Sequence, residues 1–240
     1  RLPDVAILAG GRAKRLRPMT HRMPKALVEV IGEPFIAHQL RLLRERGVER
    51  AVICTGHLGG MIQEFVGNGA RFGLAVEFSR DGRPLLGTAG AVKKALPLLS
   101  ETFFVLYGDS YLDCDYRGIQ ARFERSGKAA LMTIYRNEGR WDTSNVEYTG
   151  GRLLAYDKKH PTPRMRYIDY GLGLFQRRAF DGVPPGKPYD LAHLYRDLLR
   201  LGEVVAYEVS QRFYEIGSFE GLEEIRRHLA ARTRTGAAKA

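Results

Sequence analysis

The first 140 residues alternate between short apolar runs and segments in which apolar residues recur every three or four positions. A continuous apolar run is typical of a strand buried on both faces, whereas the wider spacing is typical of a helix with one buried face. The runs predict strands at residues 4–9, 27–30, 51–54, 74–78, 102–107 and 129–135. The spaced segments predict helices at residues 34–46, 58–66, 86–96 and 117–126.

This alternation of strand and helix predicts an α/β fold with a doubly wound, mostly parallel, Rossmann-like sheet. Right-handed crossovers place the loops that follow the strands at one edge of the sheet, where ligands bind. The loops expected at that edge contain Gly10-Gly11, Thr55-Gly56-His57 and Gly108-Asp109.

The pattern changes from about residue 141, where shorter strands are joined by turns. Strands are expected at residues 146–148, 152–156, 165–175 and 204–209, with Gly150-Gly151 in a hairpin position. Helices are expected at residues 191–201 and 219–231. We therefore expect one domain over residues 1–232, with a first lobe (1–140), a smaller antiparallel lobe (141–232) and a flexible tail (233–240).

Composition narrows the class of protein. Hydrophobic residues make up 44% and charged residues 27% of the chain, which is typical of a globular protein. The net charge of +11 leaves nucleic-acid binding as one interpretation. The basic residues are spread along the chain with acids between them, and no nucleic-acid-binding motif is present, so we expect no nucleic-acid partner.

Location is predicted from two absences in the sequence. No apolar run approaches the roughly 20 residues that span a bilayer, so we expect no membrane association. The run from Val5 to Ala9 is too short for the core of a signal peptide. Two cysteines, Cys54 and Cys114, make no disulfide framework, and we interpret them as reduced thiols in a cytoplasmic protein.

The stretch after the first strand carries the clearest chemistry. Two glycines, Gly10 and Gly11, are followed by four cations within six residues and then by Lys25 behind Pro24; the four are Arg12, Lys14, Arg15 and Arg17. Glycines let a ligand approach the backbone N–H groups, and the cations favour a polyanion such as a polyphosphate. Neither the Rossmann glycine pattern nor the P-loop is present, and a turn with solvated arginines is the alternative interpretation.

A family resemblance rests on motifs in this stretch and further along. The opening motif is Leu8-Ala9-Gly10-Gly11, Arg15-Leu16-Arg17-Pro18 and Pro24-Lys25-Ala26-Leu27. The later motifs are Leu86-Gly87-Thr88-Ala89-Gly90, Gly108-Asp109, Tyr156-Asp157-Lys158 and Tyr214-Glu215-Ile216-Gly217-Ser218. Together they resemble, in order and over residues 5–222, the sugar-1-phosphate nucleotidylyltransferases. The resemblance implies the nucleotide-diphospho-sugar transferase fold, in which the nucleotide-binding lobe is residues 1–140 and the sugar-phosphate-binding lobe is residues 141–232.

The resemblance also implies an enzyme and a role for each matching residue. A sugar 1-phosphate would attack the α-phosphorus of a nucleoside triphosphate, and pyrophosphate would leave, with positioning and charge neutralisation doing the catalysis. Arg15 would hold the leaving phosphates, Lys25 would lie near the α-phosphate, and Asp109 would be the third catalytic residue. Asp109 and Glu215 would hold Mg²⁺, which prefers oxygen ligands. No general base is required, because a sugar phosphate is already anionic.

Two sets of binding residues follow from the same resemblance. The nucleotide would contact Leu8, Ala9, Gly10, Gly11, Lys14, Gly87, Thr88 and Gly108. The sugar phosphate would contact Asn145, Asp157, Lys158 and Asp169. Ordinary structural roles remain as alternatives: a turn cap for Asp109, a solvated turn for Lys158, an ion pair for Glu215, and hairpin contacts for Asn145 and Asp169.

The chain departs from the family pattern at several positions. Ala13 and Lys14 replace the usual glycine and threonine, Lys159 stands in place of proline, and Glu215 replaces aspartate. Gly173 stands where an aromatic residue is frequent. Glutamate keeps a hard oxygen ligand on a longer arm, and alanine restricts the backbone where glycine does not.

Substrate choice is predicted from the Gly87-Thr88-Ala89-Gly90 loop, which is similar to that of guanylyltransferases for mannose- or heptose-type phosphates. No hexapeptide repeat is present in the 240 residues, as in the small heptose-phosphate guanylyltransferases and the small uridylyltransferases. GTP is therefore favoured, with UTP or dTTP as the alternative. A cytidylyltransferase-like or molybdopterin-type transferase and a non-catalytic nucleotide-sugar-sensing subunit remain open. A homo-oligomer is also possible on this resemblance.

Overall fold

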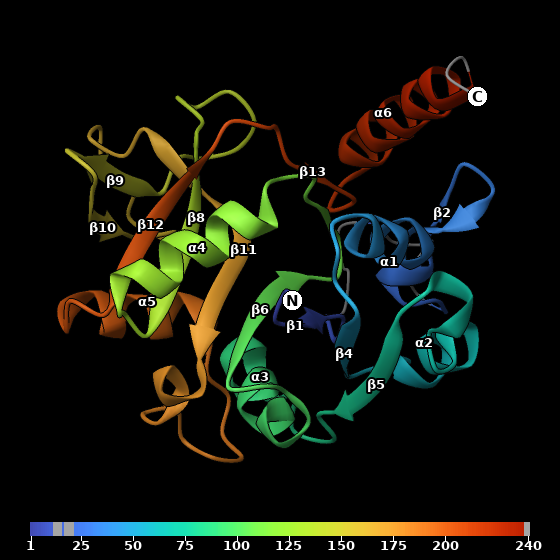
Figure 1. Ribbon diagram of the computed structural model, residues 1–240, viewed down its shortest axis with the longest axis horizontal. Coiled ribbons are helices and arrows are strands. Elements are labelled where there is room, and N and C mark those ends of the chain that lie inside the picture. Colours follow the sequence, from blue (N-terminus) through green and yellow to red (C-terminus); the bar gives the residue numbers. More distant parts are fainter. Residues whose placement is uncertain (12–15, 17–21, 238–240) are drawn as a thin grey trace.

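In the computed structural model, which describes residues 1–11, 16 and 22–237, one mixed sheet runs through the molecule (Figure 1). Within the described chain, nine strands form this sheet in the order β10-β9-β11-β6-β1-β4-β5, with β8 paired to β11 and β12 paired to β8. The strands are β1 (Asp4–Leu8), β4 (Arg50–Thr55), β5 (Ala75–Arg80), β6 (Thr102–Tyr107), β8 (Ala130–Arg136), β9 (Val146–Thr149), β10 (Arg152–Tyr156), β11 (Tyr167–Gln176) and β12 (Val204–Val209).

The described helices cover both faces of the sheet. They are α1 (Phe35–Glu45), α2 (Gly59–Val66), α3 (Gly87–Ala95), α4 (Tyr116–Ser126), α5 (Leu191–Arg200) and α6 (Phe219–Ala237). Single 3-10 turns are η2 (Lys25–Leu27), η3 (Ala70–Phe72), η4 (Leu96–Leu98) and η5 (Arg177–Phe180). These bounds agree with most of the expected elements to within two residues.

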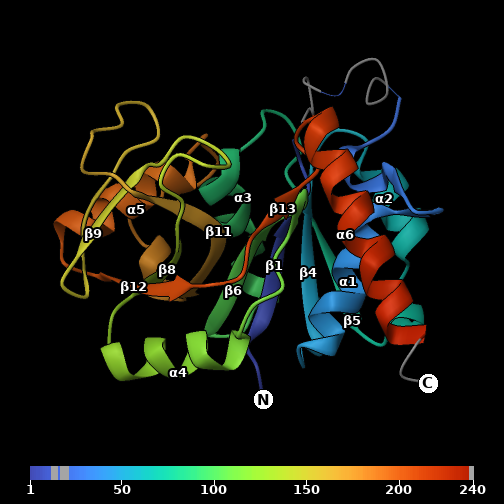
Figure 2. The same ribbon diagram turned by 90° about the horizontal axis from the view of Figure 1, so that it is seen from above.

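Side chains that alternate along a strand pack against helices on opposite faces of the sheet. In β1, Val5 and Ile7 are buried in one cluster with residues of α1, α2 and α4, while Ala6 is buried in a second cluster with residues of α3 and α5. Successive side chains of a strand point to opposite faces, so a strand apolar at every position is buried on both. Helix α6 lies alongside α1 and packs on it through a third cluster that includes Phe35 and Leu42 (Figure 2).

The prediction of a mostly parallel α/β sheet is confirmed, with one refinement. Strands β4, β1 and β6 pair in parallel, as do β5 with β4 and β12 with β8. Strand β11 pairs antiparallel with both β6 and β8. The antiparallel strands of the second lobe therefore continue the first sheet instead of packing against it.

Two predicted boundaries are wrong. The run at residues 27–30 is a 3-10 turn followed by a hairpin of β2 (Glu29–Val30) and β3 (Glu33–Pro34), whose turn residues Ile31 and Gly32 both have positive φ. Helix α6 continues to Ala237 instead of ending at residue 231, because no proline interrupts its alanine- and arginine-rich end. Residues 238–240 lie outside the described residues.

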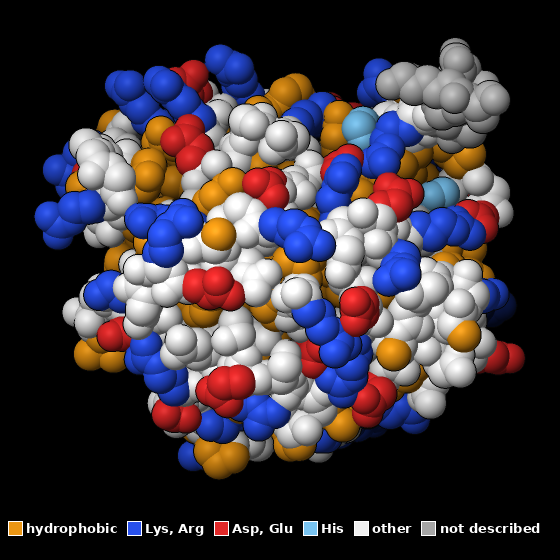
Figure 3. All heavy atoms as spheres, viewed as in Figure 1, with side chains coloured by type: hydrophobic (Ala, Val, Ile, Leu, Met, Phe, Trp, Pro, Cys, Tyr) orange, Lys and Arg blue, Asp and Glu red, His pale blue; other side chains and the backbone are white. Residues whose placement is uncertain are grey.

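Two surface properties bear on partners. No described helix combines the length and the apolar character that crossing a membrane requires. On the face shown in Figure 3, lysine and arginine side chains are interspersed with aspartate and glutamate and do not form a continuous basic patch.

Candidate active site

The carboxyl ends of β1, β4 and β6 meet at one edge of the sheet, as predicted. The Ala9 backbone N–H donates to the carbonyl of Cys54 over 2.8 Å, and the Gly108 N–H donates to the carbonyl of Leu8 over 2.9 Å. These bonds place the loop after β1 between the loops after β4 and β6. The glycine loop and the Gly108-Asp109 turn therefore lie next to each other.

Close backbone packing explains the glycine at this junction. A Cβ atom on Gly108 would lie 2.9 Å from the Leu8 carbonyl oxygen and 3.1 Å from the Ala9 Cα atom. Such distances are shorter than a carbon atom tolerates, and the obstacles are backbone atoms that cannot rotate away. Gly108 is thus required by the packing of two strand ends.

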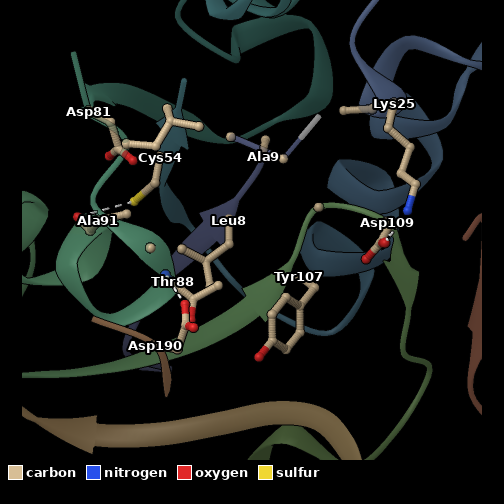
Figure 4. Close-up of a pocket in the computed structure, with 16 residues that line it drawn as sticks. Leu8, Ala9, Lys25, Cys54, Asp81, Thr88, Ala91, Tyr107, Asp109 and Asp190 are labelled. Atoms are coloured by element: carbon tan, nitrogen blue, oxygen red, sulfur yellow. Dashed lines mark hydrogen bonds and ion pairs between the residues drawn. The ribbon is translucent and has the colours of Figure 1, made fainter. Parts of the chain in front are cut away.

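A cavity of about 270 Å³ opens above these strand ends and is called the first cavity here (Figure 4). Its walls combine glycines with small and apolar side chains, and charged groups lie at its ends. The residues that line it are Leu8, Ala9, Gly10, Gly11, Lys25, Ala26, Cys54, Asp81, Leu85, Gly87, Thr88, Ala91, Tyr107, Gly108, Asp109 and Asp190.

The predicted nucleotide-binding residues fall into two groups. All of those that the structure describes line the first cavity: Leu8, Ala9, Gly10, Gly11, Gly87, Thr88 and Gly108. Lys14 lies outside the described residues, and so does the predicted catalytic residue Arg15. The described part of the set is therefore brought together in one place.

The start of α3 is held by a loop from the second lobe, which sequence reasoning missed. The carbonyl of Tyr189 accepts the backbone N–H groups of Ala89 (2.9 Å) and Gly90 (3.0 Å). The Thr88 hydroxyl accepts the Leu191 N–H over 2.7 Å, while the Asp190 carboxylate accepts the Thr88 N–H over 3.4 Å. These bonds fix the α3 end of the first cavity; no short-range sequence signal links residues 88 and 190.

At the opposite end of the first cavity, Lys25 forms an ion pair with Asp109. The Lys25 Nζ atom lies 2.6 Å from the Asp109 Oδ2 atom, and their side chains are 18% and 25% exposed. Lys25 is delivered by the 3-10 turn that follows Pro24, and Asp109 by the turn that follows β6. Figure 4 shows this pair on the far side of the cavity from Thr88 and Asp190.

A second cavity of about 450 Å³ adjoins the first and shares Tyr107 and Asp109 with it. Its lining is richer in polar side chains, most of them from the second lobe. The residues that line it are Tyr107, Asp109, Ser110, Asp142, Thr143, Asn145, Lys158, Ile168, Asp169, Tyr170, Gly171, Phe213 and Glu215. Because two residues are common to both cavities, the cavities meet at the Asp109 turn.

Asp169 is the centre of a hydrogen-bonded network in the second cavity. Its Oδ2 atom accepts the Tyr156 hydroxyl (3.1 Å) and lies 3.6 Å from the Lys158 Nζ atom. Its Oδ1 atom accepts the Gly171 N–H, and its own N–H donates to the Asn145 side-chain oxygen (2.9 Å). Asp169 therefore contacts both of the other predicted residues, Asn145 and Lys158.

The electrostatics of this network keep Lys158 charged. Burial alone would lower the pKa of Lys158, but the Asp169 carboxylate opposes it, and the pKa is raised above its ordinary value. The Lys158 side chain is still 45% exposed, so its ammonium group can reach a ligand. A protonated lysine beside an open cavity is suited to binding a phosphate.

Asp157 is placed differently from the other predicted sugar-binding residues. It does not line either cavity, and its Oδ1 atom accepts the backbone N–H groups of Lys159 (2.8 Å) and His160 (3.1 Å). These two bonds hold the pKa of Asp157 below its ordinary value. Its carboxylate stabilises the turn after β10.

Glu215 is brought beside Asp109 by a short strand pair. Strands β7 (Ser110–Tyr111) and β13 (Tyr214–Glu215) are antiparallel, with Glu215 opposite Ser110. The Ile216 N–H donates to the Asp109 carbonyl over 2.9 Å. Both carboxylates line the second cavity, and the Asp109 carboxylate belongs to a residue that lines the first cavity as well.

Gln39 of α1 was also missed by the sequence prediction. Its side-chain amide donates to the carbonyls of Tyr107 (2.9 Å) and Ser110 (2.7 Å), on either side of Asp109. A signal was present: residue 39 is three positions after Ile36 and four before Leu43, on the apolar face of the helix. A polar residue on such a face is the exception that needs explaining.

This chain is similar to known nucleotidyltransferases. A family model described as nucleotidyl transferase matches residues 5–144. The UTP–glucose-1-phosphate uridylyltransferase of Synechocystis sp. is 29% identical over 201 residues, which cover 77% of this chain and 52% of the relative. The N-acetylmuramate α-1-phosphate uridylyltransferase of Neisseria meningitidis is 29% identical over 91% of this chain and 94% of the relative. The mannose-1-phosphate guanylyltransferase of Mycobacterium tuberculosis is 28% identical over 77% of this chain and 52% of the relative.

Two solved structures share the fold. HddC of Yersinia pseudotuberculosis complexed with GMP-PN has a TM-score of 0.77 at 22% identity, covering 95% of this chain and 100% of that one. The inositol-1-phosphate CTP transferase of T. maritima has a TM-score of 0.77 at 20% identity, covering 94% of both chains.

The alignments differ in how much of each relative they reach. The chain spans about half the length of the Synechocystis and Mycobacterium enzymes and nearly all of the Neisseria enzyme. The resemblance to sugar-1-phosphate nucleotidylyltransferases and the expected fold are both confirmed. Since the matched model covers more than half of its residues, the chain belongs to the nucleotidyl transferase family.

Proposed function

We propose that the protein transfers a nucleotidyl group from a nucleoside triphosphate to a sugar 1-phosphate. The observation that carries this proposal is the meeting of two cavities at Asp109, with Lys25 bound to it. A glycine-rich cavity suited to a nucleotide and a lysine-containing cavity suited to a phosphorylated sugar share a charged junction. An in-line transfer requires this arrangement of donor and acceptor.

The reaction follows from where the charges lie. An oxygen of the sugar phosphate forms a bond to the α-phosphorus, the bond from that phosphorus to the oxygen bridging to the β-phosphate breaks, and pyrophosphate leaves with the electron pair. Lys25 neutralises charge that develops at the α-phosphate, where removal of such a group costs on the order of 10²–10³-fold in rate. A phosphate monoester has a second pKa of about 6, so its oxygen attacks without a general base.

Magnesium fits the donor set of the junction. No cluster of three or more His, Cys, Asp or Glu side chains suited to a metal occurs among the described residues. Mg²⁺ is commonly held by one or two carboxylates, with substrate phosphates and waters completing its shell. Asp109 and Glu215 would supply those carboxylates, and the ion would neutralise phosphate charge during transfer.

In the second cavity, Lys158 would bind the phosphate of the sugar, and Asn145 and Asp169 would orient its hydroxyl groups. Support comes from their shared network and from the raised pKa of Lys158. The proposed contact from Asp157 to a sugar hydroxyl has less support, because its carboxylate already accepts two backbone N–H groups.

We favour GTP with a mannose- or heptose-type 1-phosphate. Support comes from the Leu86–Gly90 loop and from the guanylyltransferase among the relatives. UTP is the second candidate, because the relative that this chain covers almost completely is named as a uridylyltransferase.

A matrix of nucleoside triphosphates and sugar 1-phosphates, scored by pyrophosphate release, tests the proposal. We expect turnover with GTP and a mannose- or heptose-type phosphate, slowed on the order of 10²–10³-fold in a Lys25→Met protein purified in the same way. Turnover with UTP or dTTP and none with GTP would overturn the choice of base. If the protein binds nucleotide but releases no pyrophosphate with any substrate pair, the proposal that it is an enzyme is wrong.

A further inference from the structure

Gln39 makes contacts that packing does not explain. It is 1% exposed and lies in α1, while the groups it binds lie in the β6–β7 turn, 68 and 71 residues further along the chain. Ile36, Leu40 and Leu43 already fill the interface between α1 and the sheet. A buried amide loses its hydration, and the Gln39 Oε1 atom has no partner among the described residues.

The orientation of this amide is determined by its acceptors. Both groups within reach are carbonyl oxygens, of Tyr107 and Ser110, so the NH₂ end must face them. A flipped amide would place its own oxygen against two others. The two N–H bonds of Gln39 therefore bind the residues immediately before Gly108 and immediately after Asp109.

The same turn has two main-chain anchors. The Gly108 N–H donates to Leu8, and the Asp109 carbonyl accepts the N–H of Ile216. Elements from three distant parts of the sequence thus hold the backbone of Asp109. Of these four bonds, the two from Gln39 are made by a side chain and can be removed without changing the backbone.

We propose that Gln39 is a positioning residue that aims the Asp109 carboxylate at Lys25 and at the divalent cation. This inference rests on the proposed function and adds a component to the same site. Without Gln39, the buried carbonyl of Ser110 and the partly buried carbonyl of Tyr107 lose this donor, and the turn shifts until they find others. A displacement of about 1 Å at a reacting centre can cost on the order of 10²-fold in rate.

The test compares Gln39→Leu, which removes both donors at similar volume, with Gln39→His, which keeps a ring N–H. For Gln39→Leu we expect kcat to fall on the order of 10²-fold and the half-saturating Mg²⁺ concentration to rise about 10- to 100-fold, as for other residues that support a metal ligand. The KM of the sugar phosphate should change by less than about twofold, since the second cavity keeps its network. Gln39→His should recover part of both losses.

Leu43→Ala is the matched control, because Leu43 is buried in the same helix and contacts neither carbonyl in the hydrogen-bond network. It should lower Tm without moving the Mg²⁺ requirement. If Gln39→Leu also lowers only Tm and leaves kcat and the Mg²⁺ requirement unchanged, Gln39 is structural and the proposal is wrong.

A direct binding measurement separates this proposal from the proposed function. Mn²⁺ binding to the wild-type and Gln39→Leu proteins, followed by electron paramagnetic resonance with nucleotide present, needs no turnover. If the wild-type protein is inactive on every substrate pair, the proposed enzymatic function is wrong. Weaker Mn²⁺ binding in the variant would still support the positioning role, and equal binding would reject it.

Discussion

The two cavities differ in the residues that line them. The first is formed by strand ends and glycine-containing turns, where Gly10, Gly87 and Gly108 bring the main chain to the surface of the cavity. The second is lined by side chains such as Lys158 and Asp169, which project from the antiparallel strands and loops of the second lobe. A main-chain wall presents the same N–H groups whatever the side chains are, whereas a side-chain wall changes with each substitution.

This difference suits a division of labour. A triphosphate needs a cradle that is common to all nucleotides, and backbone N–H groups beside glycines provide it. Selective binding of a sugar requires a hydrogen bond to each of several hydroxyl groups. Polar side chains held in a network such as that of Asp169 are suited to this. We therefore expect substitutions at the junction to affect both substrates, and substitutions in one cavity to affect one.

The largest effect is expected at the junction. Asp109→Asn removes the charge that faces Lys25 and the proposed metal, so kcat should fall about 10²–10³-fold with either substrate varied. Steady-state pyrophosphate release measures it. Asp113→Asn is the control: Asp113 pairs with Arg46 and Arg232 and lines neither cavity. If both variants lose activity, the loss does not depend on the position of Asp109 at the junction, and this prediction is wrong.

A smaller and selective effect is expected for Lys158→Met. Loss of one charge-assisted hydrogen bond costs about 1.5–3 kcal/mol, which corresponds to a 10- to 100-fold rise in the KM of the sugar phosphate. The dissociation constant of the nucleotide, measured by calorimetry, should not change. Lys159→Met is the control, because Lys159 is exposed and lines neither cavity. A change in nucleotide affinity would show that the cavities are not separable.

The converse variant is Gly108→Ala in the wall of the first cavity. Its Cβ atom would lie 2.9 Å from the Leu8 oxygen, so β1 and β6 must separate, at a cost of about 1–3 kcal/mol in unfolding free energy. Nucleotide affinity should fall with it. Gly182→Ala, where a Cβ atom meets nothing within 4 Å, should be close to neutral in denaturant unfolding. Equal stability of the two variants would contradict the close approach of the strand ends.

The smallest effect concerns the thiols. Burial raises the pKa of Cys54 and of Cys114 to about 12, so almost no thiolate forms at pH 8. A disulfide reagent at pH 8 should therefore label neither thiol in the native protein and both in guanidinium, even though Cys54 lines the first cavity. If one thiol of the native protein is labelled rapidly, and nucleotide prevents this labelling, the wall of the first cavity is open to the reagent and the thiol is not buried.

Local patterns were sufficient for much of the fold. The run at residues 102–107 is apolar after Thr102 and is followed by a glycine, so both the strand and its edge loop could be predicted from neighbouring residues. The roles expected of Leu8, Gly10 and Lys25 come from the family resemblance, whose opening motif lies in three pieces within residues 8–27. These three residues all line the first cavity.

Non-local features could not be found in that way. The antiparallel position of β11 between β6 and β8 depends on pairings across many residues, which no short pattern specifies. Asp190 and Gln39 act on turns about 70 to 100 residues away. The resemblance of the Tyr156-Asp157-Lys158 segment predicts a sugar contact for Asp157, and in the structure its carboxylate accepts backbone N–H groups of its own loop.

Tyr107 lines both cavities, and burial raises the pKa of its hydroxyl to about 12, so it remains neutral. The Lys158 Nζ atom lies 5.7 Å from the centre of that ring. A ligand that shifts the ring in one cavity changes the wall that the other ligand meets. Thermodynamic linkage requires the resulting coupling free energy to be the same in both directions. Nucleotide affinity measured with and without sugar phosphate thus reports how the affinity for sugar phosphate responds to nucleotide.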